Sequence, residues 1–242
     1  SYGQGNVPVP PPGVTYTAFA LGSVHSVALR SDGTVIAFGD DSRGQSTAPA
    51  LPPGLVPAQV AAGGTSSLVR FASGELVTWG DDDWLAPPMP LATGERWQRI
   101  AVGTSLLGLT TAGRIGETGR ITAPVPALPL GMSYRAVVAG TLLALALRSD
   151  GRIVAWGQNS QGQLAIPPLP PGLAYVTADV GSSRALLLRS DGTVLENGYG
   201  GATYVPPPGL AYVALSCHDQ GSLLLRSDGA LFVEGSSSNN QT

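Results

Sequence analysis

The sequence predicts an all-β fold, a six-bladed β-propeller. The first observation is a repeat, because residues 24–45, VHSVALRSDGTVIAFGDDSRGQ, return clearly or faintly along the whole chain. The second is the period of roughly 40 residues, which is typical of propeller blades and not of helical solenoids. The third is that the copies carry no 3.6-residue apolar pattern and many glycines and prolines, which argues against helices.

Two glycines mark each copy of the repeat. The further copies span residues 67–80, 106–119, 144–163, 185–198 and 222–235. The first glycine stands between two apolar runs, at Gly33, Gly74, Gly113, Gly151, Gly192 and Gly229. The second ends the following run, at Gly39, Gly80, Gly119, Gly157, Gly198 and Gly235. Both are interpreted as backbone positions with a positive φ or in close packing.

Three strands can be placed in each copy. Asp-Gly between apolar runs is a strong hairpin signal, since both residues tolerate a positive φ, so residues 26–30 should pair with residues 34–38. Runs such as residues 144–147 are apolar on both faces, which indicates burial on both faces, as in a radial stack of sheets. A proline tract then leads to another strand, expected at residues 16–20 or 174–178. Proline cannot donate to a ladder, so the tracts should lie at the outer edge or in connections.

The two ends of the chain are expected to close the ring as one domain over residues 1–242. Residues 1–10, SYGQGNVPVP, match the segment that follows the second glycine, with Gln4 in the place of Gln45. We therefore expect residues 1–13 to complete the last blade and remove its open edge, and about 236–242 to form a frayed tail. A start in mid-copy without methionine is interpreted as a piece of a longer protein.

The composition argues against several classes of function. Charged residues make up 12%, the 13 basic residues are all arginine, and the net charge is −3. Because basic residues are not clustered, a nucleic-acid surface is not expected, and the absence of lysine removes Schiff-base chemistry. A single cysteine, Cys217, forms no internal disulfide and no zinc cluster. No apolar run reaches membrane-spanning length. We expect a monomer without cofactor or metal.

Few residues offer catalytic chemistry. His25 is one of only two histidines and is interpreted as a hydrogen-bonded structural residue. Cys217 and His218 are neighbours on an expected strand, so their side chains should point to opposite faces and not form a nucleophile pair. Cys217 is interpreted as a small buried residue.

The acidic residues have a structural and a functional interpretation. Asp40-Asp41 and residues 81–83 lack the spacing of a calcium loop, so solvated loops are preferred. Glu117, Glu196 and Glu234 lie near the same level in copies three, five and six. Two such carboxylates facing each other would be a general acid–base pair, which is the alternative.

Two stretches carry a family resemblance. HSVALRSDGTVIAFG at residues 25–39 and ALALRSDGRIVAWGQNSQGQ at residues 144–163 resemble the repeat of the regulator of chromosome condensation (RCC1) family, closest to its short bacterial version with Pro-Pro-Gly-Leu-x-Tyr-Val linkers. The resemblance implies a propeller of four-stranded blades. Family members often have seven blades, whereas six copies occur in this chain. The family includes a nucleotide exchange factor for a small GTPase and secreted β-lactamase inhibitors, which share a shape and protein binding but no common site, so no functional residue is transferred.

Positions at which the copies differ are where a site is expected. The residue before the second glycine is aromatic in Phe38, Trp79 and Trp156, but three copies have Thr118, Asn197 and Glu234. The loops after that glycine also differ, and their Arg, Trp and Tyr residues are usual anchors of protein interfaces. The residues predicted to bind a partner are Arg43, Trp84, Arg120, Tyr199 and Tyr204.

These observations predict a non-catalytic binding or scaffold module that presents a face of loops to a protein. An extracellular or cell-surface location is expected, as part of a larger exported bacterial protein. The alternative is a carbohydrate-binding propeller with Trp79, Trp84 and Trp156 as platforms, although columns that differ between copies favour one composite protein site. A third possibility is an enzyme at the pore mouth, which the scarcity of His and Cys and the absence of Lys disfavour.

Overall fold

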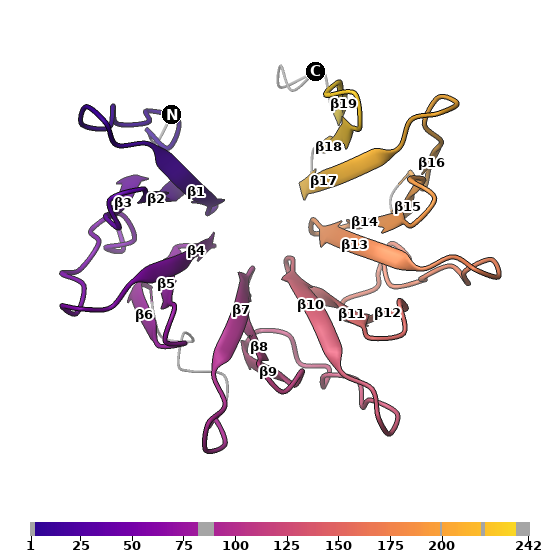
Figure 1. The fold of residues 1–242 in the computed structure, drawn as a ribbon, viewed down its shortest axis with the longest axis horizontal. Helices are drawn as coiled ribbons and strands as arrows, with labels where there is room; N and C mark the ends of the chain where they lie inside the picture. Colours follow the sequence, from indigo (N-terminus) through magenta and orange to yellow (C-terminus); the bar gives the residue numbers. More distant parts are fainter. Residues whose placement is uncertain (1–2, 82–89, 199, 219–220, 236–242) are drawn as a thin grey trace. The chain divides into compact units, whose positions relative to one another are not determined.

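The structure is a computed structural model that describes residues 3–81, 90–198, 200–218 and 221–235. Its regular structure over these residues is entirely β, and each copy of the repeat forms its own antiparallel sheet (Figure 1). Over the described part of the chain, no helix is long and apolar enough to cross a membrane. The chain divides into two compact units, Ser1–Arg120 and Ile121–Thr242.

The strands of each sheet follow one another in sequence order. Unit 1 contains the sheets β1 (Tyr16–Leu21), β2 (His25–Arg30) and β3 (Val35–Gly39); β4 (Pro57–Gly63), β5 (Ser66–Phe71) and β6 (Leu76–Gly80); and β7 (Trp97–Val102), β8 (Ser105–Thr110) and β9 (Ile115–Gly119). Unit 2 contains β10 (Tyr134–Ala139), β11 (Leu143–Arg148) and β12 (Ile153–Gly157); β13 (Tyr175–Val180), β14 (Arg184–Arg189), β15 (Val194–Gly198) and β16 (Thr203–Tyr204); and β17 (Tyr212–His218), β18 (Gly221–Arg226) and β19 (Leu231–Gly235).

The predicted hairpin forms, with one left-handed residue in its turn. The backbone N–H of Arg30 donates to the carbonyl of Thr34 at 2.9 Å, and that of Gly33 donates to the carbonyl of Arg30 at 3.0 Å. Gly33 has a φ of 82°, whereas Asp32 does not have a positive φ, so only the glycine adopts the left-handed conformation that both residues tolerate. The turn is a type I turn followed by a left-handed glycine. Asp32 instead accepts a hydrogen bond from the N–H of Thr34 at 2.9 Å.

The interpretation of the second glycine is confirmed in the five copies for which a φ is described. The φ values are 118° at Gly39, 99° at Gly80, 126° at Gly119, 103° at Gly157 and 100° at Gly198. A Cβ added at Gly157 would lie 2.3 Å from the carbonyl oxygen of Leu142. Both the left-handed backbone and this close approach exclude a side chain.

Four-stranded sheets are the exception. Among the described residues only the fifth sheet gains a fourth strand, the two-residue β16. After β3, β9 and β12 the described chain continues into segments that contain several prolines, and a proline has no N–H to donate to a ladder. After β12 this segment contributes apolar side chains to the core instead, including Leu164, Ile166 and Leu169. Ring closure, the place of residues 1–13 in the last blade and the single-domain organisation stay predictions, and residues 236–242 lie outside the described part.

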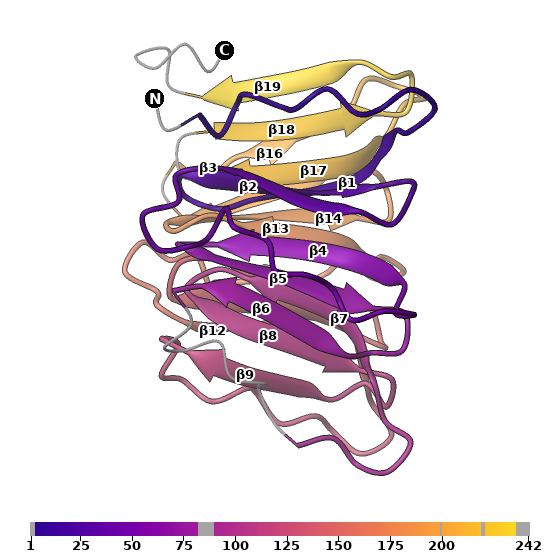
Figure 2. The same cartoon turned by 90° about the vertical axis from the view of Figure 1, so that its left-hand side faces the viewer.

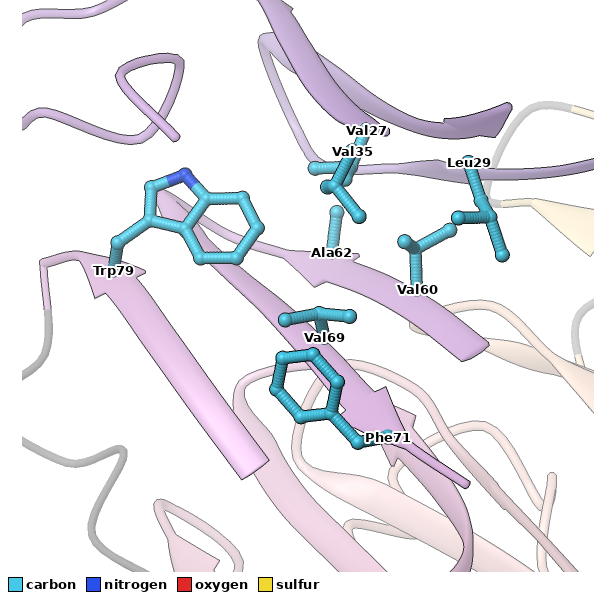
Figure 3. Close-up of a cluster of buried hydrophobic side chains, with 8 residues drawn as sticks. All are labelled: Val27, Leu29, Val35, Val60, Ala62, Val69, Phe71 and Trp79. Carbon is cyan, nitrogen blue, oxygen red and sulfur yellow. The ribbon is translucent and has the colours of Figure 1, made fainter. Parts of the chain in front are cut away.

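The core lies between successive sheets of each unit. In unit 1, β4 lies against β1 and β2, and β7 against β4 and β5 (Figure 2). The first two sheets enclose a buried cluster, formed by Val27, Leu29, Val35, Val60, Ala62, Val69, Phe71 and Trp79 (Figure 3). In unit 2, Leu143 and Leu145 of β11 pack in the same way against Leu187 of β14. The prediction that strands apolar on both faces are covered by neighbouring sheets is therefore confirmed within each unit.

Candidate functional site

A neutral hydrogen-bonded contact links the first two sheets. His25 is fully buried, and its Nε2 lies 2.8 Å from Oγ of Ser67. The Ser67 hydroxyl donates to the carbonyl of Gln45 at 2.8 Å, and Nε1 of Trp79 donates to the same oxygen at 3.0 Å. Because the hydroxyl proton points to Gln45, the imidazole must donate from Nε2. The structural interpretation of His25 is confirmed.

The N-terminal segment makes a corresponding hydrogen bond to the first sheet. Oγ of Ser26 donates to the carbonyl of Gln4 at 2.9 Å. Ser26 stands in β2 where Ser67 stands in β5, so Gln4 relates to the first sheet as Gln45 relates to the second. The similarity of residues 1–10 to the segment around Gln45 therefore has a counterpart in the contacts.

The buried His25 makes stability depend on pH. Burial lowers the pKa of His25 from its ordinary 6.5, so the folded protein binds a proton less readily than the unfolded chain. As the pH falls below 6.5 towards this lowered pKa, the free energy of unfolding should decrease by up to about 1.4 kcal/mol per pH unit from this residue. Urea unfolding between pH 7.5 and 5 measures it. His25→Gln keeps a donor to Ser67 but cannot titrate, so an equal slope in that variant would contradict the assignment.

The contact between the fifth and sixth sheets, both in unit 2, has a different composition. Ser222 is paired with Glu234 across the strands, and Ser67 is paired with Trp79, so Ser222 and Glu234 occupy the positions of Ser67 and Trp79. Arg184 is paired with Gly198, just as His25 is paired with Gly39, so Arg184 occupies the position of His25. Tyr204 follows Gly198 at the same distance along the chain as Gln45 follows Gly39. The four positions of the neutral contact are thus occupied by Arg184, Ser222, Tyr204 and Glu234.

These residues form a charged cluster together with Glu196 of β15. The Glu196 side chain is 2% exposed, and its Oε1 lies 3.2 Å from a guanidinium nitrogen of Arg184. The Tyr204 hydroxyl donates to Oε2 of Glu196 at 2.6 Å and also contacts Oε2 of Glu234. Burial, followed by the two carboxylates, raises the pKa of Tyr204 well above its ordinary value. The phenol therefore keeps its single proton, which cannot satisfy both carboxylates at once.

Two buried polar groups at this cluster lack hydrogen-bond partners among the described residues. One is Oγ of Ser222, a residue that is 4% exposed, and the other is Nε of Arg184. A buried hydroxyl without a partner costs about 1–3 kcal/mol. The corresponding Ser67 hydroxyl, by contrast, contacts both Nε2 of His25 and the carbonyl of Gln45.

A pocket of about 200 Å³ adjoins the cluster at one end of the sixth sheet. It is lined by Ser216, His218, Gly221, Ser222, Leu223, Val233 and Glu234. β17 ends at His218, β18 begins at Gly221 and β19 ends at Gly235, which places the pocket at that end. This is the edge of the sheet from which the loop after the third strand leaves.

The predicted partner-binding residues have different surroundings. Arg43 is exposed and pairs with Asp81 at 3.0 Å, while the exposed Arg120 donates its backbone N–H to the carbonyl of Thr104. Tyr204 lies in β16, half-buried, with its hydroxyl in the charged cluster instead of on an open loop. Trp84 and Tyr199 lie outside the described residues. Tyr204 therefore contacts Glu196 and Glu234, whereas Arg43 and Arg120 contact other residues, Asp81 and Thr104.

Two of the proposed sugar platforms are part of the core. Trp79 is 6% exposed and Trp156 is 4% exposed, whereas Phe38 is half-buried. A sugar ring stacks on an open aromatic face, so Trp79 and Trp156 cannot serve as platforms in this structure. The third residue of that set, Trp84, is not described.

The remaining chemistry candidates have structural environments. Cys217 is buried, and this burial raises the pKa of its thiol to about 12, while His218 is exposed, so the prediction that they form no nucleophile pair is confirmed. Asp40 accepts hydrogen bonds from Ser42 Oγ and Gln45 Nε2, both at 2.6 Å. Asp41 likewise binds its own loop. No group of three His, Cys, Asp or Glu residues within the described ranges could hold a metal ion.

Comparisons with known proteins agree with this architecture. Residues 16–45 and 134–163 match the family described as regulator of chromosome condensation (RCC1) repeat. No curated protein sequence matches the chain. Yeast RCC1 (Prp20) bound to Kap60 is 17% identical, with a TM-score of 0.74 over 91% of this chain and 70% of that chain.

Two further solved structures have the same arrangement of sheets. Human WBSCR16 is 17% identical, with a TM-score of 0.76 over 91% of this chain and 77% of that one. The CRINKLY WD40 ectodomain of the Arabidopsis thaliana receptor kinase ACR4 is 14% identical, with a TM-score of 0.69 over 93% of this chain and 81% of that one. At such identities the likeness concerns the fold. The chain therefore contains RCC1-type repeats, matched at residues 16–45 and 134–163, in a propeller-like fold.

Proposed function

We propose that the chain is a non-catalytic module that binds a protein partner at the edge where the loops after the third strands leave the sheets. The observation that carries the proposal is the replacement of a neutral contact by the charged cluster of Arg184, Glu196, Tyr204 and Glu234, next to a pocket at this edge. Burying charges is unfavourable unless they are well paired, so stability alone does not account for the replacement.

Similar folds support a protein as the partner. One similar structure is yeast RCC1 (Prp20) bound to Kap60, and another concerns the binding properties of Prp20p to Gsp1p and histones. These statements apply to those proteins. They support the proposal because a protein of similar fold binds other proteins.

The exposed Arg43 fits this role. Its side chain is 61% exposed and its partner Asp81 is 30% exposed, and such a surface pair contributes about 0–1 kcal/mol. A partner can therefore take over the guanidinium at little cost. Arginine is also enriched at the centres of protein interfaces.

The geometry supports binding better than catalysis. The structure brings Glu196 and Glu234 to one hydroxyl, as the acid–base alternative requires. However, Glu196 is buried and paired with Arg184, so its carboxylate cannot reach a substrate proton. The carbohydrate alternative loses the platforms Trp79 and Trp156 to the core.

Affinity capture tests the proposal. The immobilised protein is exposed to secreted and membrane extracts and to a glycan panel, alongside a variant with Arg43→Ala, Trp84→Ala and Tyr199→Ala. The control is Arg152→Ala, an arginine that is 72% exposed, against 61% for Arg43, on the hairpin turn at the opposite end of its sheet. We expect one protein to be retained by the wild type and the control and lost by the triple variant. Equal retention by all three, or glycan binding alone, would contradict the proposal.

A further inference from the structure

The Tyr204 hydroxyl contacts two carboxylates, and each contact needs a proton. Its oxygen lies 2.6 Å from Oε2 of Glu196 and also contacts Oε2 of Glu234. Two oxygens at this distance repel each other unless a hydrogen lies between them. A phenol has one O–H, which can occupy only one of the two contacts. The geometry therefore requires a second proton, carried by one of the carboxylates.

The second proton belongs on Glu234. The ion pair of Glu196 with Arg184, at 3.2 Å, requires Glu196 to be ionised. None of the ion pairs within the described residues includes Glu234. Ser222 lies directly opposite Glu234 in the sheet, but its buried Oγ has no hydrogen-bond partner there and does not compensate the charge.

The other titratable groups of the fifth and sixth sheets do not supply this proton. Burial raises the pKa of the Cys217 thiol to about 12, and its backbone N–H donates to Asp179 of β13 at 2.8 Å. Burial also raises the pKa of Asp179, while His218 is exposed at the end of β17. Asp191 and Asp228 pair with arginines at the opposite, hairpin end of these sheets. Asp179 is therefore the group whose titration has to be separated from that of Glu234.

We propose that Glu234 holds a proton at pH values at which exposed glutamates are ionised, and that this proton makes the contact between the fifth and sixth sheets sensitive to pH. The protonated carboxyl donates to the Tyr204 oxygen, the phenol donates to Glu196, and Glu196 pairs with Arg184. When Glu234 loses its proton, two carboxylates face one hydroxyl and the contact with Tyr204 becomes repulsive. This property goes beyond the proposed function and does not depend on a partner.

Loss of the proton should weaken the fold as the pH rises. A glutamate of the unfolded chain has a pKa of about 4.3, so above that pH the folded protein binds one proton more than the unfolded chain. The unfolding equilibrium constant should then increase by up to about tenfold per pH unit, until Glu234 is ionised in the folded protein as well. The sign is opposite to that of His25, which destabilises the fold as the pH falls.

NMR of protein labelled at the glutamate carboxyl carbons shows the protonation state directly. We expect the Glu234 signal to remain at the position of a protonated carboxyl at pH 6, where the signal of exposed Glu75 is that of a carboxylate. Asp179 is unlabelled and does not contribute. Through-bond assignment identifies Glu234 without a variant. A Glu234 signal that titrates together with that of Glu75 would overturn the proposal.

Urea unfolding of the wild type and Glu234→Gln between pH 5 and 9 measures the effect on the fold. The glutamine amide keeps a donor for the Tyr204 oxygen but cannot lose it over this range. We expect the ratio of the wild-type unfolding constant to that of the variant to increase with pH, by up to about tenfold per unit, and then to level off. His25 is present in both proteins, so its titration cancels in the ratio.

Two further variants make the unfolding result specific. In an Asp179→Asn background the increase should persist, whereas its disappearance would assign the proton to Asp179 and overturn the proposal. Glu75→Gln is the matched control, because Glu75 is exposed and its ratio to the wild type should stay constant over the same range. A constant ratio for Glu234→Gln would likewise show that Glu234 is ionised throughout.

Discussion

Replacing Arg184 by leucine should lower the free energy of unfolding by about 3–5 kcal/mol. The Glu196 side chain is 2% exposed and would remain buried after losing its guanidinium partner. Removing one partner of a buried ion pair leaves an uncompensated charge, and this is the origin of the large effect. The Tyr204 hydroxyl still donates to Glu196, which places the expected value nearer the lower end. Urea unfolding of Arg184→Leu against the wild type measures it.

The chain itself supplies the control. The fourth sheet has Leu143 and Ala155 where the fifth has Arg184 and Glu196, so Arg184→Leu with Glu196→Ala restores a combination that the repeat already uses. Exchanging a buried ion pair for apolar residues is often neutral or stabilising. We expect the double variant to recover most of the loss, with a coupling energy of about 2 kcal/mol or more in the double-mutant cycle. Additive losses would show that the two charges do not interact.

The sheets could be predicted because their signals are local. The Asp-Gly pair, the flanking apolar runs and the second glycine lie within one copy, and the β2–β3 hairpin differs from the expected strands by one residue at three of its four ends. The conformation of Asp32 could not be read in this way. Its carboxylate binds the N–H of Thr34 and stabilises a type I turn, although Asp-Gly also suits the turn with two positive φ values.

The charged cluster could be predicted only in part, because its residues come from β14, β15, β16 and β19 of two sheets. Comparison of the copies placed Glu196 and Glu234 at one level and picked out Tyr204. The comparison of copies does not predict that β16 pairs with β15, with Val194 opposite Tyr204. In this position the Tyr204 hydroxyl lies in the charged cluster and not on an open loop. A fourth strand does not form after β3 or β12, where side chains of the proline-containing segments pack against the core without completing a ladder.

Replacing Trp79 by alanine should cost about 3–5 kcal/mol of stability, as truncation of a large buried aromatic residue usually does. The indole is 6% exposed, packs in the cluster of the first two sheets and donates from Nε1 to the carbonyl of Gln45 at 3.0 Å (Figure 3). An exposed sugar platform would behave in the opposite way. Its truncation would change stability by less than about 0.5 kcal/mol and reduce glycan binding. Urea unfolding and the glycan panel, applied to the same variant, separate the two roles.

Trp79→Phe separates packing from hydrogen bonding, and the repeat itself has Phe38 at this position. The phenyl ring fills much of the same space, and the Gln45 carbonyl keeps the Ser67 hydroxyl as a donor at 2.8 Å. The phenylalanine variant should therefore lose little more than one hydrogen bond, about 1 kcal/mol, and stay well above the alanine variant. If both variants were equally unstable, the indole N–H would be the main contribution of Trp79. If neither were destabilised, Trp79 would lie outside the core, and the carbohydrate alternative would regain a platform.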